Sequence, residues 1–222
     1  MQVIMSADIP RSWRPAAFPT DVAAVRRLEE WIPSETYNLN GMERDFRGAD
    51  LSGGDFSNCW FTDAVLVDVR LVGASFYRAD LRSADLTRAD LTGADLVKAN
   101  LDEAILRSAV LDGADMVGAS LSDVDARGAS FRGTRPIGAE LLDTDMRGSD
   151  LSDAVVEENY FEIKVDDTTV LRGLRGTVFG PVTVVGDGSS REVGGAELEA
   201  WIRARGGQVQ VIPPRRPAVG AP

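Results

Sequence analysis

Several residue types that carry chemistry in other proteins are absent or rare in this 222-residue chain. It contains no histidine, which excludes His-ligated zinc sites, Ser-His-Asp triads and imidazole acid–base chemistry. Its single cysteine excludes an intramolecular disulfide and is typical of a reducing compartment. No run of about 18 apolar residues is present, and the N-terminus lacks a basic region followed by an apolar stretch. The sequence therefore predicts no membrane span and no secretory signal, and we expect a cytoplasmic protein.

Positive charge is also scarce. The 24 Lys and Arg residues are outnumbered by 35 Asp and Glu, and the resulting formal charge of -11 argues against direct binding to nucleic-acid phosphates. Between residues 44 and 163 there are 23 acidic and 12 basic residues, whereas the rest of the chain holds 12 of each. The net charge therefore belongs to the middle of the chain. Only one of the ten prolines, Pro136, falls in this range, as expected where backbone N–H groups are used in pairing.

The middle of the chain contains a repeat with a period of five. From Phe46 to Phe161 an apolar residue, here called the anchor, recurs at every fifth position; the 24 anchors are 13 Leu, 6 Phe, 2 Met and one each of Ala, Pro and Val. Two residues before most anchors the side chain is small, and it is Ala in 15 of the 24 repeats. A period of five fits neither a helix nor a flat strand. It predicts a chain that turns a corner every five residues and buries its anchors by stacking coils on one another.

Residues 20 apart indicate that four corners close one coil. An unbroken column of glycine indicates a corner whose backbone needs a positive φ, as in a type II turn: Gly53, Gly73, Gly93, Gly113 and Gly133. A second column is apolar and follows the anchor: Tyr77, Val97, Val117 and Ile137. Because the two columns are independent, the sequence predicts a four-sided coil.

The stretch ADLRSADLTRADLTGADLVKANL, residues 79–101, resembles the pentapeptide-repeat family, whose consensus is A(D/N)LXX. The resemblance covers about residues 44–163. It implies an all-β solenoid, a right-handed quadrilateral β-helix with the anchor and the preceding Ala inside. Sets of four repeats give about six coils and a rod of about 29 Å at about 4.8 Å per coil. Ala126 and Pro136 at anchor positions, and bulky residues such as Trp60 beside the first coils, depart from the consensus and predict a locally looser or reshaped interior.

The segments on either side are expected to cap the rod, because an open stack exposes apolar side chains and unpaired backbone at each end. Residues 1–43 form the N-terminal segment. Within it, residues 20–32 predict a capping helix with Thr20 as N-cap and Pro33 just beyond its end.

Residues 164–212 predict a small α+β C-terminal cap, and residues 213–222 are expected to be a disordered tail. The cap is expected to contain a strand over 177–185, a hairpin return over 191–193, a helix over 196–205 and a strand over 208–212.

Stacking places four acidic residues on one corner, as a candidate partner-binding surface: Asp63, Glu103, Asp123 and Asp143. An arginine column lies on another side: Arg47, Arg107, Arg127 and Arg147. Two interpretations stay open. Either the acidic residues belong to the repeat consensus and keep the rod soluble, or a rigid acidic rod imitates the charge of a nucleic-acid duplex and occupies a DNA-binding groove.

The apolar column of Tyr77, Val97, Val117 and Ile137 is expected to be exposed, because the residue after the anchor points away from the core. Four stacked side chains would present a few hundred Å2, a patch size that often marks a contact. We expect the C-terminal cap or a second copy of the chain, in a homodimer, to cover it in preference to an unrelated partner.

Motifs for catalysis, cofactor binding or metal binding are absent. GDGSSR, residues 186–191, lacks the last glycine of a dinucleotide loop and the lysine of a phosphate loop, and predicts a hairpin turn. One carboxylate per corner does not supply the six to eight clustered oxygens that calcium takes. Cys59 falls in an interior column and predicts a buried small side chain. We therefore expect no enzyme, no cofactor and no metal.

The leading hypothesis is a non-catalytic protein-interaction scaffold with a rigid acidic surface. The resemblance implies a narrower alternative, because similar proteins include quinolone-resistance proteins that bind DNA gyrase or topoisomerase IV as DNA mimics. Under that alternative the chain is a topoisomerase modulator that gives self-protection or fluoroquinolone resistance.

Overall fold

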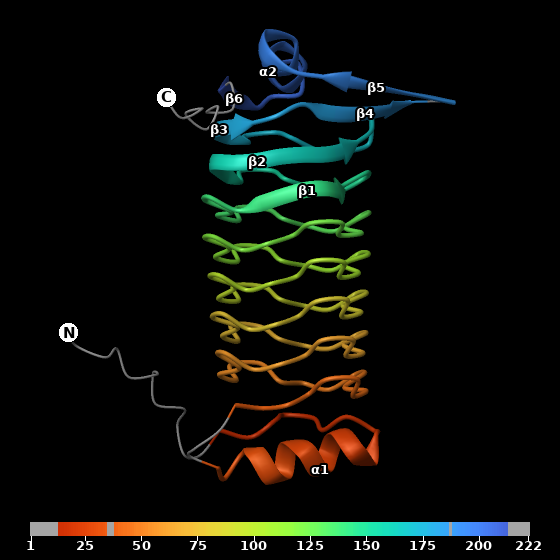
Figure 1. The fold of residues 1–222 in the computed structure, drawn as a ribbon, viewed down its shortest axis with the longest axis vertical. Coiled ribbons are helices and arrows are strands. Elements are labelled where there is room, and N and C mark those ends of the chain that lie inside the picture. The colour runs from red at the N-terminus through yellow and green to blue at the C-terminus, as the bar shows by residue number, and fades with distance from the viewer. Residues whose placement is uncertain (1–12, 35–37, 187, 213–222) are drawn as a thin grey trace, which may run out of the picture.

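The chain winds into a straight stack of four-sided coils with a helix across each end (Figure 1). The computed structural model describes residues 13–34, 38–186 and 188–212. The expected disordered tail, residues 213–222, and the first twelve residues of the expected N-terminal segment lie outside the described residues. Helix α1 (Val22–Trp31) lies across the end where the stack begins, and α2 (Gly195–Arg203) lies across the opposite end.

Successive coils pair in parallel at a spacing of 20 residues. Backbone bridges join Asn40 to Trp60 at the start of the stack and Asp150 to Val170 toward its other end. The pairing therefore begins before residue 44 and continues beyond residue 163, the limits expected from the repeat. The few residues of each bridge are flanked by corners, so continuous strands form only in the last coils.

The backbone amides of each repeat are used in a fixed way, as the repeat from Leu86 to Asp90 shows. The amides of Leu86 and Arg88 donate to carbonyls of the next coil at 2.8 and 2.9 Å. The Asp90 amide donates to the previous coil at 2.9 Å, and the Ala89 amide closes a turn onto the Leu86 carbonyl at 2.9 Å. The stack thus satisfies four amides of every five and leaves that of Thr87 to a side chain.

Each corner has a positive φ at the second residue after the anchor, between 53° and 69° from Glu43 to Glu158. The predicted glycine column has φ between 62° and 69°, so the prediction of a positive φ is confirmed. Asp, Glu, Asn, Ser, Arg and Lys adopt the same φ at other corners. A turn of this kind therefore accepts side chains that tolerate the left-handed region.

The anchors and the small residues before them fill the inside of the stack. Leu86 and Leu106, which lie one coil apart, are both fully buried. Phe56 and Phe76 stack across neighbouring coils with ring centroids 5.3 Å apart. Trp31 of α1 stacks on Phe56 at 5.5 Å, so the helix covers the first coils with an aromatic contact.

Helix α1 begins one residue later than the sequence predicts. Its N-cap is Asp21, whose Oδ2 accepts the Ala24 amide at 2.8 Å, and not Thr20. Thr and Asp both cap helices well, and the two residues are adjacent. The backbone path into the helix, which the sequence does not reveal, therefore decides which of them is the N-cap. Ala24, Leu28 and Trp31 form the buried side of the helix.

The interior is loosely packed around the anchor Pro136. A cavity of about 10 Å3 lies there, lined by residues that include Met116, Phe131, Pro136 and Leu141. The neighbouring turn is long, since the Ala139 amide lies 3.5 Å from the Pro136 carbonyl. Proline has no amide to donate to the next coil, which weakens the pairing at this point.

The five-residue register shifts by one in the last coils. Strand β1 (Glu140–Asp145) pairs in parallel with β2 (Val155–Val165); Leu142 lies opposite Glu162, but Thr144 lies opposite Ile163. One corner residue is omitted, so Val165 takes the place of an anchor and is buried. Pairing at a spacing of 20 resumes at Val170.

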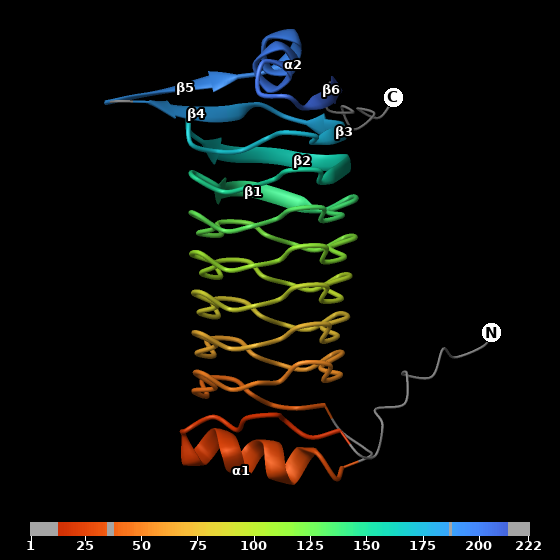
Figure 2. The ribbon, with the colours of Figure 1, turned by 180° about the vertical axis from the view of Figure 1, so that it is seen from behind.

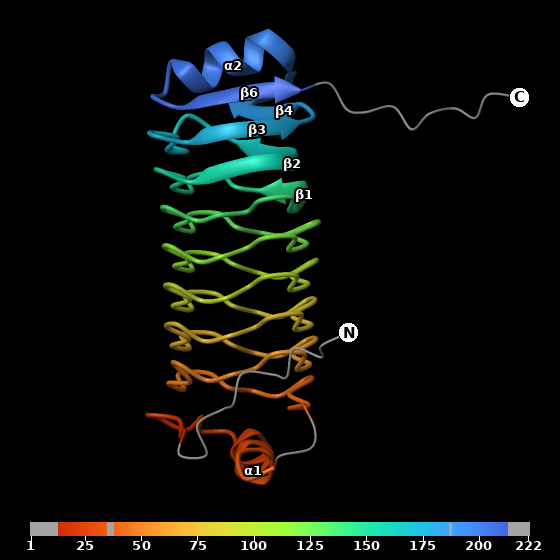
Figure 3. The ribbon, with the colours of Figure 1, turned by 90° about the vertical axis from the view of Figure 1, so that its left-hand side faces the viewer.

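The C-terminal elements extend the stack and do not lie against its side (Figure 3). The single strand expected over 177–185 is wrong: β3 (Arg175–Phe179) and β4 (Val182–Gly186) are separate, because Gly180 has a φ of 97° and Pro181 follows it. The remaining strands are β5 (Ser189–Val193) and β6 (Gln208–Ile212). The order in the sheet is β5-β4-β2-β3-β6, with β1 also paired to β2, and the β4–β5 hairpin projects sideways from the rod (Figures 1 and 2).

Helix α2 closes the last strand of the stack. It packs on β6, and Oε1 of Glu199 accepts the outward amide of Val211 at 2.9 Å. Leu198 and Ile202 are buried beneath the helix. The end of the sheet is therefore covered by a helix that also supplies a hydrogen-bond acceptor.

Candidate functional site: an acidic face on the rod

The Asp that precedes many anchors has a structural task. Oδ1 of Asp85 accepts the backbone amide of Thr87 at 3.0 Å, and Oδ1 of Asp90 accepts that of Thr92 at 3.1 Å. Asn100 does the same for Asp102 at 2.9 Å. These side chains take the one amide of the repeat that the stack leaves over. This class of carboxylate is therefore engaged by its own backbone.

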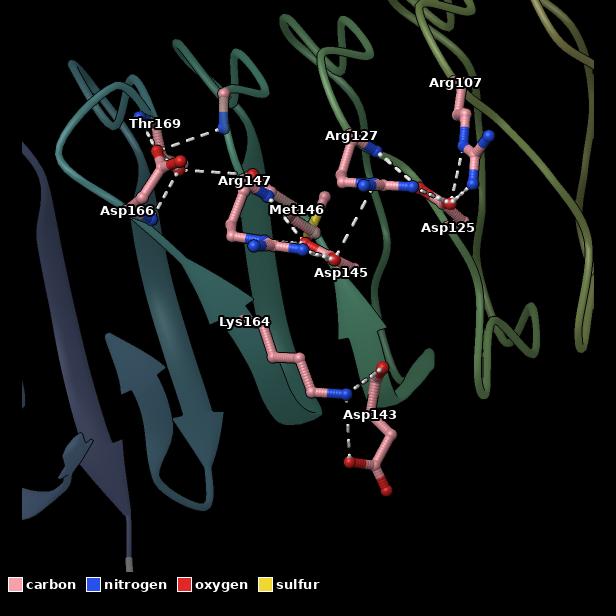
Figure 4. A network of polar contacts seen from close by, with 11 residues as sticks. Arg107, Asp125, Arg127, Asp143, Asp145, Met146, Arg147, Lys164, Asp166 and Thr169 are labelled. Atoms are coloured by element: carbon pink, nitrogen blue, oxygen red, sulfur yellow. Dashed lines mark hydrogen bonds and ion pairs between the residues drawn. The ribbon is translucent and has the colours of Figure 1, made fainter. Parts of the chain in front are cut away.

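The acids beside the arginine column form a second class, because arginine side chains neutralise their charge. Asp125 contacts Arg107 at 2.6 Å and Arg127 at 2.7 Å, and Asp145 contacts Arg147 at 2.5 Å (Figure 4). These pairs link three successive coils on one side of the rod. Their charges cancel, so this side contributes little to the net charge.

The pKa values of these carboxyls follow the ion pairs. Hydrogen bonds from Arg127 lower the pKa of Asp125, against an opposing effect of burial, and Arg107 lowers it further. Burial raises the pKa of Asp145, but the hydrogen bonds from Arg147 outweigh it and leave the pKa below its usual value. Both groups are ionised at neutral pH.

The four acidic candidates are arranged differently. Asp63, Glu103, Asp123 and Asp143 lie at the same corner of different coils, are exposed, and have φ between 53° and 61°. Glu103 accepts a hydrogen bond from Ser83 at 3.3 Å, and Asp143 lies 3.6 Å from the ammonium of Lys164 (Figure 4). Within the described ranges, the carboxylates of Asp63 and Asp123 have no hydrogen bond and no ion pair.

The side of the rod next to this corner is strongly acidic. Each coil has three outward positions on this side: the residue before the anchor, the residue after it and the corner residue. We define the acidic face as these positions in successive coils, from residues 40, 42 and 43 to residues 160 and 162. It carries nine carboxylates and one cation: Glu43, Asp63, Asp80, Asp102, Glu103, Asp123, Glu140, Asp143, Glu162 and Arg82. The cation is engaged by Asp80, at 2.6 Å. Most of the net negative charge of the chain therefore lies on one face.

The apolar column is less exposed than the sequence leads one to expect. Tyr77, Val97, Val117 and Ile137 are all only partly exposed. Each side chain is covered in part by its neighbours in the stack, and the Arg78 guanidinium lies 5.3 Å from the Tyr77 ring. The C-terminal elements lie at the end of the rod and do not cover this column (Figure 1).

Cys59 is placed in the interior. It is buried, and burial raises the pKa of its thiol to about 12. The Leu39 amide donates to its sulfur at 3.2 Å. Over the described part of the chain, no group of three or more His, Cys, Asp or Glu is placed to hold a metal ion.

Sequence reasoning assigned Trp60 to a reshaped interior and missed Tyr160, but both are exposed aromatic residues of the acidic face. Trp60 is 44% exposed near its first coils, and Tyr160 is 49% exposed near its last. Both occupy the position directly before the anchor, where the repeat usually has Asp or Asn. Large aromatic residues at an outward position of a polar repeat were the available signal.

The fold defines a four-sided β-solenoid, and comparison with known families agrees with it. The family described as pentapeptide repeats matches with eight copies over residues 45–82, 84–123 and 119–156. These segments cover half of the chain, so the chain belongs to the pentapeptide-repeat family. Proteins of this family fold as right-handed β-helices.

Solved structures similar to the chain are also pentapeptide-repeat proteins. HetL from the cyanobacterium Nostoc sp. strain PCC 7120, described as involved in heterocyst differentiation regulation, has a TM-score of 0.51 and 20% identity, covering 72% of this chain and 86% of its own. A protein of the Arabidopsis thaliana thylakoid lumen has a TM-score of 0.41 and 40% identity, covering 41% of this chain and 64% of its own. Full-length QnrB1, a plasmid-mediated fluoroquinolone resistance protein, has a TM-score of 0.31 and 17% identity, covering 75% and 92%.

No curated protein matches the chain. Among the described helices, none has the length and apolar character needed to cross a membrane.

Proposed function

We propose that this protein is a non-catalytic interaction scaffold that presents its acidic face to a basic surface of a protein partner. The observation that carries the proposal is the division of labour among its carboxylates. Asp residues before the anchors cap the backbone, and those beside the arginine column are paired. Asp63 and Asp123 do neither, so their charges are available to a partner.

The geometry supports long-range attraction. Coils are about 4.8 Å apart, and the Debye length at physiological salt is about 8 Å, so carboxylates in neighbouring coils add their fields. A rigid array of one sign accelerates encounter with a basic partner and orients it. Affinity for the partner is therefore expected to fall as salt rises.

The test is affinity capture from native cell extract with three forms of the full chain. Asp63→Lys/Asp123→Lys reverses two charges of the acidic face; Lys98 has a φ of 59° at the equivalent corner position, so lysine is compatible with this backbone. Asp153→Lys/Glu157→Lys makes the same charge change at exposed residues on other sides of the rod. We expect the wild type and the control to retain a shared partner and the first variant to lose it. Equal capture by all three forms would refute the proposal.

A narrower candidate is a DNA-mimic modulator of DNA gyrase or topoisomerase IV that gives self-protection or fluoroquinolone resistance. The straight acidic face supports it, since a groove that holds DNA is basic. Gyrase supercoiling is measured with and without a fluoroquinolone. Neither inhibition nor rescue at micromolar protein would discard this candidate and leave the general one intact.

A further inference from the structure

Two aromatic rings lie side by side at the C-terminal end of the acidic face. Tyr160 of β2 and Phe179 of β3 are paired in register, and their ring centroids are 5.5 Å apart at an interplanar angle of 39°. Tyr160 is 49% exposed and Phe179 is partly exposed. The pair therefore presents ring surface to the outside, where the equivalent position of the four coils before it carries Asp, Asn, Ser or Glu.

Two carboxylates flank the rings. Glu140 of β1 lies opposite Tyr160 in the register, so it occupies the adjacent outward position one coil back. Glu162 follows Tyr160 by two residues on the same strand and therefore points to the same side. A Cβ built on Gly180 would lie 3.1 Å from Cγ of Glu162, so that side chain runs beside the chain segment that follows Phe179.

No cation of the described residues is placed on this group. The nearest lysine on the same strand, Lys164, contacts Asp143. Glu140 and Glu162 are exposed and take part in no ion pair between described residues. Elsewhere the chain covers aromatic rings with its own arginines, Arg78 on Tyr77 and Arg205 on Trp201 at 5.3 and 3.8 Å. The Tyr160–Phe179 pair lacks such a partner in the part of the chain that the structure describes.

We propose that Tyr160, Phe179, Glu140 and Glu162 form a binding site for an arginine or lysine side chain of a basic protein partner. The ring faces attract a cation through their quadrupole, and the two carboxylates pair with its charge. This inference rests on the proposed function and deepens it, because it fixes which end of the acidic face recognises a cationic side chain. The rings add a contact that salt does not screen as strongly as it screens the carboxylates.

The test measures binding of a fluorescently labelled octa-arginine peptide to the full chain by anisotropy, in low salt and at about 0.5 M salt, where the Debye length is about 4 Å. We expect Tyr160→Ala to weaken binding about two- to five-fold in both salts, and Tyr160→Phe to retain it. Tyr77→Ala, which removes a ring from another side of the rod, is the matched control and is expected to bind like the wild type. Thermal unfolding of Tyr160→Ala should match the wild type, since the side chain is half exposed.

Each result bears on a different claim. If Asp63→Lys/Asp123→Lys weakens binding but Tyr160→Ala does not, the aromatic site is wrong and the acidic face still stands. If neither variant weakens binding, the proposed function fails as well. Arg215 and Arg216 follow Ile212, which is paired with Phe179 in the register. If Arg215→Ala/Arg216→Ala strengthens peptide binding several-fold, the chain's own arginines occupy the site, and a partner's cation does not.

Discussion

Oδ1 of Asp85 accepts the backbone amide of Thr87 at 3.0 Å, and this is the one amide of its repeat without a backbone acceptor. This hydrogen bond explains why the repeat consensus has an acidic residue at the position before the anchor. It also separates acids that hold the corners from acids that have no hydrogen bond or ion pair among the described residues. The carboxylates of the chain therefore do not form one uniform acidic surface.

Asp85→Ala tests this role. Loss of the acceptor leaves a partly buried amide unpaired, and we expect the free energy of unfolding to fall by about 1 kcal/mol. Asp85→Asn keeps an acceptor at the same place and is expected to stay within about 0.5 kcal/mol of the wild type. Urea unfolding followed by circular dichroism measures both. Equal loss in the two variants would mean that charge, and not the hydrogen bond, matters at this position.

The inside of the rod gives a larger effect. Leu96 is fully buried, and Leu96→Ala is expected to cost about 2–5 kcal/mol. Arg88 lies on the surface in an ion pair with Asp68, with both side chains about half exposed, so Arg88→Ala is expected to be nearly neutral. The same unfolding experiment compares them. Similar losses from both changes would contradict the assignment of inside and outside.

Gly176 occupies an anchor position for a steric reason. Its φ is 125°, and a Cβ built on it would lie 1.6 Å from the Val156 carbonyl oxygen of the neighbouring strand. Gly176→Ala therefore has to displace β3 and is expected to cost at least about 3 kcal/mol. Gly93→Ala is the control: its φ is 65°, but nothing lies within 4 Å of the added atom. We expect the control to cost about 1 kcal/mol from the left-handed backbone alone, and limited proteolysis to cut β3 and β6 only in Gly176→Ala.

Much of this architecture follows from sequence because the period of five repeats the same local solution many times. The positive φ of the glycine column is such a case. The register shift between Leu142 and Thr144 could not be predicted in this way. It arises because one corner residue is omitted before Ile163, and a single omission has no repeated pattern in the sequence that would reveal it. The division of the strand expected over 177–185 was signalled by Gly180 and Pro181, but its run of Val and Thr residues favoured one strand.

Only part of the candidate site could be predicted from the sequence in the same way. The acidic corner could be identified because residues 20 apart stack. The half-burial of Val97 and Val117 could not, because it depends on how neighbouring coils cover one another. The pairing of Tyr160 with Phe179 spans a spacing of 19 residues and lies outside the regular repeat. It required the register of β2 and β3.

The ion pairs beside Asp125 predict a dependence of stability on pH. The pKa of Asp125 is lower in the folded protein than in the unfolded chain, where it is about 3.9. Its contribution is therefore fully present above about pH 4 and is lost as pH falls through the folded pKa. Arg127→Ala removes the main cause of the low pKa. We expect the stability difference between wild type and this variant to be largest at pH 7 and to shrink below pH 4.

Arg172→Ala is the control for that measurement, since Arg172 is exposed and forms no ion pair among the described residues. Urea unfolding at pH 7, 4 and 3 compares the three proteins. A difference between wild type and Arg127→Ala that stays constant over this range would show that the loss arises from packing of the arginine stem and not from the charge on Asp125.

Glu199 helps to close the end of the stack with one side-chain hydrogen bond. The last strand, β6, has one edge on β3, and its outward Val211 amide is taken by Oε1 of Glu199 at 2.9 Å. Without that acceptor the amide points to an open edge, which is a template for another strand. We therefore expect Glu199→Ala to increase concentration-dependent association in sedimentation velocity. Glu197→Ala removes an exposed carboxylate from the same helix, where it pairs with Arg191, and is expected to sediment like the wild type. If both variants stay unchanged, the bulk of α2 alone closes the edge.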